Sequence, residues 1–100
     1  MTYVSVSRLR VPAERADELI TAFRARVGLV DGFDGFENLE VWQNDRDPGE
    51  LTMVSRWRDR DCFKAYMKSR EHQISHDRIA SDLDAAIKLE KLEHLHVVAQ

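Results

Sequence analysis

The chain has 100 residues, of which 43% are hydrophobic and 33% are charged, and its formal net charge is -3 at pH 7. This balance is typical of a globular domain and excludes a disordered chain. Acidic and basic residues are interspersed, so no basic stripe indicates a nucleic-acid partner. No apolar run approaches the roughly 20 residues that a membrane-spanning helix needs. We therefore expect one domain over residues 1–100, without a signal peptide, a membrane partner or a nucleic-acid partner, located in the cytoplasm.

Residues 2–11, TYVSVSRLRV, predict the first strand because they are rich in valine and bounded by a proline. The apolar side chains change phase along this segment. Val4 and Val6 point to one face, whereas Leu9 and Val11 point to the other. A strand with this pattern is buried on both faces.

The next segment changes to the period of an amphipathic helix. Pro12 suits the first helical turn, and Gly28 is a plausible stop. Arg24 and Arg26 lie near the expected carboxyl end, where the helix dipole favours cations. The apolar residues with helical spacing are Ala16, Leu19, Ile20, Phe23 and Val27.

The middle of the chain predicts a β-hairpin. The glycine-rich loop GFDGF precedes an expected strand over residues 36–44, with Leu39 and Val41 on one face and Trp42 on the other. A turn over residues 45–50 contains the Pro-Gly pair. The segment LTMVSRW, residues 51–57, is the expected partner strand.

Helical segments and a last strand complete the expected elements. Asp59 is placed to cap a helix that carries Phe63, Tyr66 and Met67 on one side. Ser69 is placed to cap a further helical segment that reaches His76. Residues 76–91 indicate partial helix, and residues 92–99 predict the last strand.

The resulting order, β-α-β-β-α-β, predicts an α+β ferredoxin-like fold: a four-stranded antiparallel sheet with its helices on one face. The uncovered face would present Val4, Val6 and Val54, together with part of the last strand. Such a patch is larger than a soluble monomer usually exposes. We therefore expect a homodimer in which two sheets pack together as a dimeric α+β barrel.

The stretches GFDGFENLEVW and LTMVSRWRDRDCFKAYMKS, with the SH at residues 75–76, resemble the antibiotic biosynthesis monooxygenase superfamily of dimeric α+β barrels. Within it, the likeness is greatest to the Isd-type heme-degrading monooxygenases. The resemblance implies that His76, ten residues after Tyr66, binds the heme iron. It also implies catalytic positions at Ser7 and Tyr66, where those enzymes carry Asn and Trp, and a cavity lined by Phe23. Arg26 is a candidate partner for the heme carboxylates.

The resemblance implies a heme-binding monooxygenase that can degrade heme with O2 and electrons from an external reductase. An alternative is a cofactor-free monooxygenase acting on a polycyclic phenol or quinol, with His76 or His72 as the proton acceptor. Its ligand would be a small flat aromatic in place of a porphyrin. A third alternative is a non-catalytic dimeric binding module that keeps the fold. His72, His94 and His96 are either further metal ligands with His76 or surface and interface residues.

Overall fold

The computed structural model of the protein describes residues 1–26 and 30–100, without the side chain of Arg26. The elements are β1 (Tyr3–Arg10), the short 3-10 helix η1 (Ala13–Arg15), α1 (Ala16–Arg26), β2 (Phe36–Gln43), β3 (Glu50–Trp57), α2 (Arg60–Met67), α3 (Arg70–Asp77), α4 (Ser81–Ala86) and β4 (Lys88–His96). The four-stranded sheet has the order β2-β3-β1-β4, and its pairs are antiparallel. The predicted ferredoxin-like fold is confirmed.

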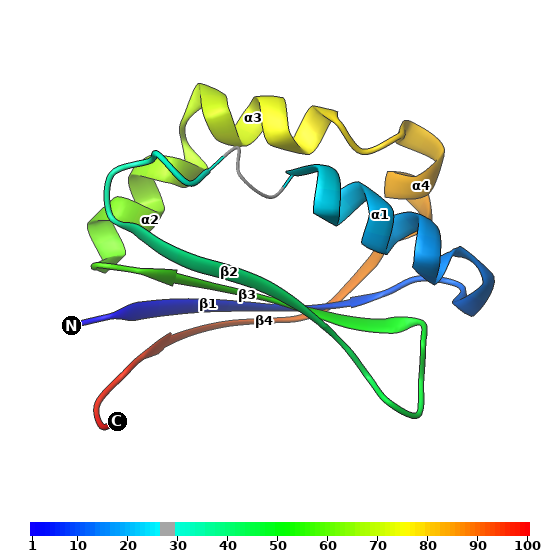
Figure 1. Cartoon of the computed structure of the whole chain (residues 1–100), viewed down its shortest axis with the longest axis horizontal. Coiled ribbons are helices and arrows are strands. Elements are labelled where there is room, and N and C mark those ends of the chain that lie inside the picture. Colours follow the sequence, from blue (N-terminus) through cyan, green and yellow to red (C-terminus); the bar gives the residue numbers. More distant parts are fainter. Residues whose placement is uncertain (27–29) are drawn as a thin grey trace.

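The helices cover one face of the sheet and leave the other face open (Figure 1). Strand β1 lies in the interior of the sheet, and its side chains alternate between the two faces. Leu9 and Val11 pack toward the helices, in a core that contains Leu19 and Leu51. The change of phase in the sequence of this strand reflects its two faces, since Val4 and Val6 lie on the open face, opposite Leu9 and Val11.

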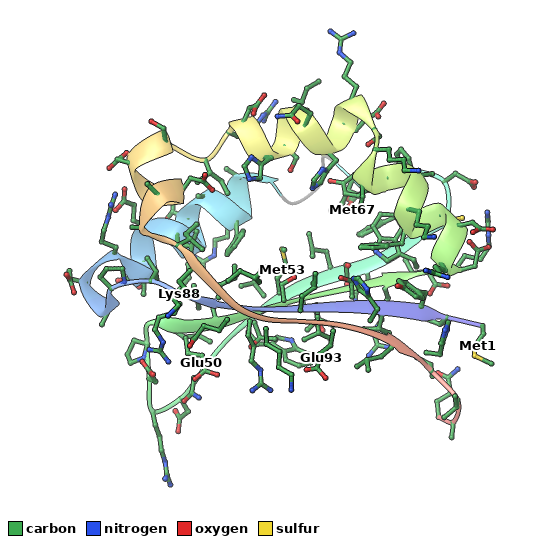
Figure 2. All side chains as sticks on the ribbon, turned by 180° about the vertical axis from the view of Figure 1, so that it is seen from behind. Met1, Glu50, Met53, Met67, Lys88 and Glu93 are labelled. Carbon is green, nitrogen blue, oxygen red and sulfur yellow. The ribbon has the colours of Figure 1, made fainter. Side chains whose placement is uncertain are left out.

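Aromatic residues form a second core cluster at the other end of the sheet. Trp57 is 1% exposed and packs in this cluster with Tyr3, Val30, Cys62 and Tyr66. Side chains fill the space between the sheet and the helices along most of its length (Figure 2). Among the described residues, no helix is long and apolar enough to cross a membrane.

Two side chains begin the helices at the positions that the sequence predicts. The Cys62 N–H donates to Asp59 Oδ1 at 2.9 Å, and this bond caps α2. The His72 N–H donates to Ser69 Oγ at 3.1 Å, and this bond caps α3. Because Ser69 begins a separate helix, the phase of α3 is independent of that of α2. This break decides which later side chains face the sheet.

The last strand differs from its predicted bounds of residues 92–99. Strand β4 spans Lys88–His96 because it pairs with β1 along its whole length, including the pair Leu9↔Leu89, across a register shift between Arg8 and Leu9. Val97 lies beyond the strand, although its N–H still donates to the Thr2 carbonyl at 3.0 Å. Val27 and Gly28, where the first helix is predicted to end, lie outside the described residues.

Gly35 has a backbone conformation that other residues adopt only with strain. Its φ is +82°, and an added Cβ would lie 2.4 Å from Cys62 Sγ. We expect Gly35→Ala to lower the free energy of unfolding by about 2 kcal/mol or more, because both the left-handed backbone and the contact are unfavourable. Urea denaturation of the purified variant measures this loss.

Gly32 provides the matched control, since an added Cβ there meets nothing within 4 Å. Gly32→Ala should therefore change stability by less than about 0.5 kcal/mol, as for a surface substitution. Adding Cys62→Gly to Gly35→Ala removes both Cys62 Sγ and Cys62 Cβ, which lie 2.4 and 2.5 Å from the added Cβ. It should restore only the part of the loss that is due to these contacts and leave the part that is due to the backbone. Equal losses from the two glycine variants would contradict this account.

Candidate functional site

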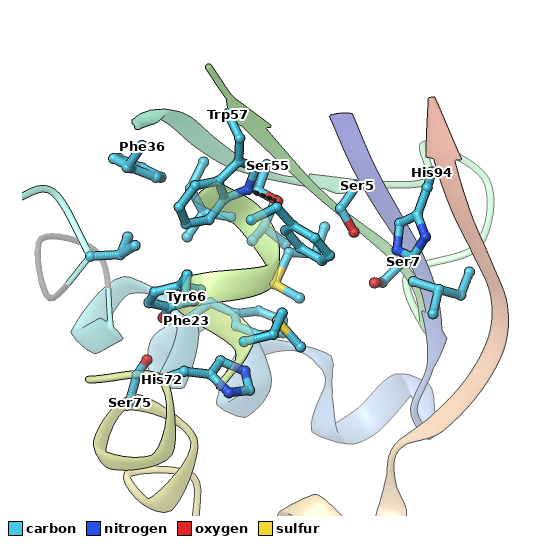
Figure 3. A pocket seen from close by; sticks show the side chains of 17 residues that line it. Ser5, Ser7, Phe23, Phe36, Ser55, Trp57, Tyr66, His72, Ser75 and His94 are labelled. Atoms are coloured by element: carbon cyan, nitrogen blue, oxygen red, sulfur yellow. Dashed lines mark hydrogen bonds between the residues drawn. The ribbon is translucent and has the colours of Figure 1, made fainter. Parts of the chain in front are cut away.

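A cavity of about 220 Å³ lies between the sheet and the helical layer. Side chains from β1, β2, β3 and β4 form its floor, and side chains from α1, α2 and α3 form its roof (Figure 3). The lining is mostly apolar and includes Phe23, Val30, Phe36, Leu39, Val41, Met53, Trp57, Phe63, Met67 and Leu92. Its polar members are Ser5, Ser7, Ser55, Tyr66, His72, Ser75 and His94. An apolar cavity with a few converging polar groups is typical of a small-molecule site.

Tightly packed aromatic rings form one wall of the cavity. The Trp57 ring centroid lies 5.1 Å from that of Tyr66 and 5.4 Å from that of Phe36. Phe63 approaches the same indole at 5.9 Å, edge to face. Rings at these separations attract one another and leave little freedom to move. The wall is therefore a rigid surface suited to a flat aromatic ligand.

Two polar residues of α3 reach the roof of the cavity. His72 and Ser75 are three residues apart, so they share one face of the helix. The His72 ring meets the Tyr66 ring edge to face at 5.1 Å. In Figure 3, His72 and Ser75 lie on the helical side of the cavity, opposite the sheet. This arrangement places an imidazole against the apolar interior.

The floor carries hydroxyl groups and a second imidazole. Ser5 and Ser7 come from β1, Ser55 from β3, and His94 from the edge strand β4. The Trp57 Nε1–H donates to Ser55 Oγ at 3.0 Å, which orients that serine. The ring of His94 lies beside the rings of Tyr3 and Phe63, at 5.6 and 5.3 Å, and these two rings also contact each other at 5.4 Å.

The structure brings together three of the predicted site residues: Ser7, Phe23 and Tyr66 all line the cavity. His76 is not part of the lining, since its Nε2 lies 3.7 Å from Asp84 Oδ1 and its side chain is 51% exposed. Its role as an iron ligand stays a prediction. The side chain of Arg26, the other predicted cofactor contact, lies outside the described part of the chain.

Sequence reasoning missed Ser5, named His72 only as an alternative to His76 as proton acceptor, and left His94 without a role in the cavity. Ser5 could have been found from Ser7, because residues two apart in a strand share a face. His94 required the register between β1 and β4, which pairs it with Ser5. His72 required the position of the α3 cap. Within residues 1–26 and 30–100, no group of three or more His, Cys, Asp or Glu side chains could hold a metal ion.

Cys62 lies outside the lining of the cavity and is buried. Burial raises the pKa of its thiol, and the nearby Asp59 carboxylate adds to the rise while the Arg58 guanidinium opposes it. The Cys62 N–H in turn holds the pKa of Asp59 below its usual range. A thiol with a raised pKa stays protonated at neutral pH and is a poor nucleophile.

Residues 2–78 match the family model described as antibiotic biosynthesis monooxygenase. The chain belongs to this family. Among its relatives is a heme-degrading monooxygenase from Halalkalibacterium halodurans, which is 34% identical over 71 residues. The match covers 69% of this chain and 60% of that relative, so the chain spans less than two thirds of the relative's length.

Solved structures of this family share the fold along nearly the whole chain. MhuD, a heme-degrader from Mycobacterium tuberculosis solved with two hemes in its active site, has a TM-score of 0.81 at 20% identity, covering 98% of this chain and 97% of its own. SnoaB, a cofactor-independent oxygenase from Streptomyces nogalater, has a TM-score of 0.81 at 13% identity, covering 99% and 95%. At these identities the similarity shows the fold alone.

Proposed function

We propose that this family member is a monooxygenase whose substrate is a small, flat, oxygen-bearing aromatic held in the cavity, and that the substrate itself reduces O2. The observation that carries this proposal is the cavity, which combines a rigid aromatic wall with an imidazole on its roof and hydroxyls on its floor. The family assignment supports the reaction class.

The size of the cavity supports a ligand of two or three fused rings. A dry protein cavity of about 150 Å³ binds benzene. The cavity here, at about 220 Å³, is larger than that and smaller than the roughly 300 Å³ at which drug-sized pockets begin.

A porphyrin, with its four pyrrole rings, is larger than a ligand of two or three fused rings. In addition, His76 is turned toward Asp84 and solvent. The size of the cavity and the direction of His76 support a ligand smaller than heme.

The proposed reaction balances without a further reductant. A phenol, or its keto tautomer, that carries hydrogen opposite the oxygen takes up O2. One oxygen atom becomes a new carbonyl, and the other leaves as water with two hydrogens from the substrate, giving a quinone. His72 accepts the proton whose loss makes the ring electron-rich, as a general base does. The apolar walls exclude water and hold the ring in one orientation.

Heme oxidation is the second candidate function, and two observations favour it. A 34% identical relative is a heme-degrading monooxygenase, and the spacing of Tyr66 and His76 resembles that of the Isd-type enzymes. This candidate requires His76 to turn from Asp84 toward the cavity and the helical layer to move away from the sheet. It would also require an external reductase.

Two measurements on the purified protein separate these candidates. In an oxygen electrode, anthrone should drive O2 uptake with formation of anthraquinone, with no reductant added. A hemin titration should give no saturable Soret shift at one heme per chain. A saturable Soret shift without anthrone turnover would overturn the proposal in favour of heme chemistry. Binding of anthrone without O2 uptake would indicate a binding module.

We also propose that the protein is a homodimer joined through the open face of the sheet. On this face Val6 pairs with Val54, and Val4 pairs with Leu95. Leu95 is 47% exposed and Trp42 is 51% exposed in the single chain. A second copy would cover this apolar surface, and an obligate interface of this kind buries well over about 1,000 Å².

Light scattering at micromolar concentration should give twice the chain mass of 11.6 kDa. Leu95→Asp should shift the protein toward monomer, because it places a charge in the apolar interface. Leu89→Asp is the matched control, since Leu89 is 54% exposed and pairs with Leu9 on the helix-facing side. A monomeric mass for the unaltered protein would overturn the dimer.

A further inference from the structure

Three polar side chains form a row across the floor of the cavity. Ser5 on β1 pairs in register with Ser55 on β3 and with His94 on β4. We call Ser55, Ser5 and His94 the floor row. Directly opposed residues in antiparallel strands have Cβ atoms about 4.5–5.5 Å apart. The three side chains therefore stand beside one another on the helix-facing side of the sheet, and all three line the cavity.

Ser5 at the centre of this row is buried, and its hydroxyl has no partner within the described residues. The residue is 7% exposed, and within the described residues its hydroxyl makes no hydrogen bond. Every fully buried side-chain oxygen or nitrogen among those residues has a hydrogen-bond partner. Because the Ser5 hydroxyl makes no such bond, its oxygen is not fully buried and is open to the cavity. Figure 3 shows it on the sheet side, pointing into the cavity near His94. A buried hydroxyl without a partner is unfavourable unless a ligand or water meets it.

Ser55 adds a second donor beside Ser5. Its oxygen accepts the Trp57 Nε1–H at 3.0 Å, which leaves its own hydrogen to donate elsewhere. Two hydroxyl donors on adjacent strands can therefore reach one oxygen atom in the cavity. The imidazole of His94, packed against Tyr3 and Phe63, flanks the same point.

We propose that the floor row binds the oxygen substituent of the aromatic ligand and stabilises it as an oxyanion. The ligand then stands with its oxygen on the sheet and the opposite ring carbon toward His72 on the roof. In the keto tautomer, the ring carbon opposite the oxygen loses its proton to His72, and the negative charge moves onto the oxygen, where Ser5 and Ser55 donate to it. This inference rests on the proposed function and narrows the substrate class to aromatic hydroxyl or keto compounds.

A matched pair of probes tests this inference by binding alone. 2-Naphthol and 2-methylnaphthalene have nearly the same shape, and only the first carries an oxygen. Equilibrium dialysis should show the protein binding 2-naphthol about tenfold more tightly, the size expected for one or two added hydrogen bonds. Ser5→Ala should reduce this preference to about twofold or less, with 2-methylnaphthalene bound as before. The pH at which bound 2-naphthol ionises, followed by its absorbance, should rise in the same variant.

Ser81→Ala is the matched control, because Ser81 is an exposed serine at the start of α4 that does not line the cavity. It should keep most of the preference for 2-naphthol. Ser5→Thr retains a hydroxyl and should also keep the preference for 2-naphthol. If Ser5→Ala folds poorly by circular dichroism, Ser5→Cys takes its place.

Binding of both probes without a preference, or a preference that Ser5→Ala retains, would overturn the floor row while leaving the proposed function standing. Binding of neither probe would overturn both.

Discussion

His72→Ala should reduce anthrone-driven O2 uptake by about a hundredfold to ten-thousandfold, the range that a positioned general base contributes. His72 is the residue on the roof of the cavity that can accept a proton, and its ring lies against Tyr66 at 5.1 Å. Removing the imidazole leaves no histidine on the roof of the cavity, and the remaining imidazole, that of His94, lies on the floor beside the ligand oxygen. Initial rates in an oxygen electrode at several pH values measure the loss.

His76→Ala is the matched control for this prediction. It removes the same side chain four residues later on the same helix, at a position that faces Asp84 and solvent. It should keep O2 uptake within about twofold of the unaltered protein, since a surface substitution of this kind changes little. His72→Gln, which keeps a polar side chain of similar length, should remain as slow as His72→Ala. A large loss from His76→Ala with little from His72→Ala would reverse the assignment and make His76 the proton acceptor.

Trp57→Ala should produce the largest loss of stability, about 3–5 kcal/mol. The indole is 1% exposed, contacts Phe33, Phe36, Phe63 and Tyr66, and donates its Nε1–H to Ser55. Its removal opens a cavity that the surrounding rings cannot fill. Because a domain of this kind is stable by only about 5–15 kcal/mol, the variant should be near its unfolding threshold. Urea denaturation followed by circular dichroism measures the difference.

Trp57→Phe separates the packing contribution from the hydrogen bond. It retains one ring against the aromatic wall and should cost clearly less than Trp57→Ala, while it leaves the Ser55 oxygen without its donor. If Trp57→Ala lost less than about 1 kcal/mol, the indole would not be the packing centre of the second core cluster. If Trp57→Ala and Trp57→Phe lost the same stability, the contribution of the indole would come from its hydrogen bond to Ser55 and not from its packing.

Periodicity in the sequence predicts most of the helices and strands and their inward faces, because these depend on side chains that are close together in the chain. The change of phase between Val4 and Leu9 predicts a strand buried on both faces, and the helix side of β1 is the one that carries Leu9. Asp59 and Ser69 cap α2 and α3 at the predicted positions. The bounds of β4 were less predictable, since they depend on pairing with β1, nearly a whole chain length away.

The candidate site was predictable only in part. Ser7, Phe23 and Tyr66 line the cavity, because each lies on the inward face of an element whose pattern is plain in the sequence, and their roles stay predictions. The role expected for His76 came from the family resemblance and its spacing to Tyr66, and it stays a prediction, because the way α3 docks on the sheet cannot be read from that spacing. Because α3 begins anew at Ser69, His72 and Ser75 face the cavity and His76 approaches Asp84.

The sequence by itself determined the order of the elements, the inward and outward faces of β1 and the helix caps, all of which depend on neighbours within a few residues. Only the tertiary structure decided that Ser55, Ser5 and His94 form one row and that His72 lies across the cavity from it. The physical reason is that strand register and the docking of α3 on the sheet are set by packing between segments far apart in the chain, and a shift of one residue would turn each side chain to the other face.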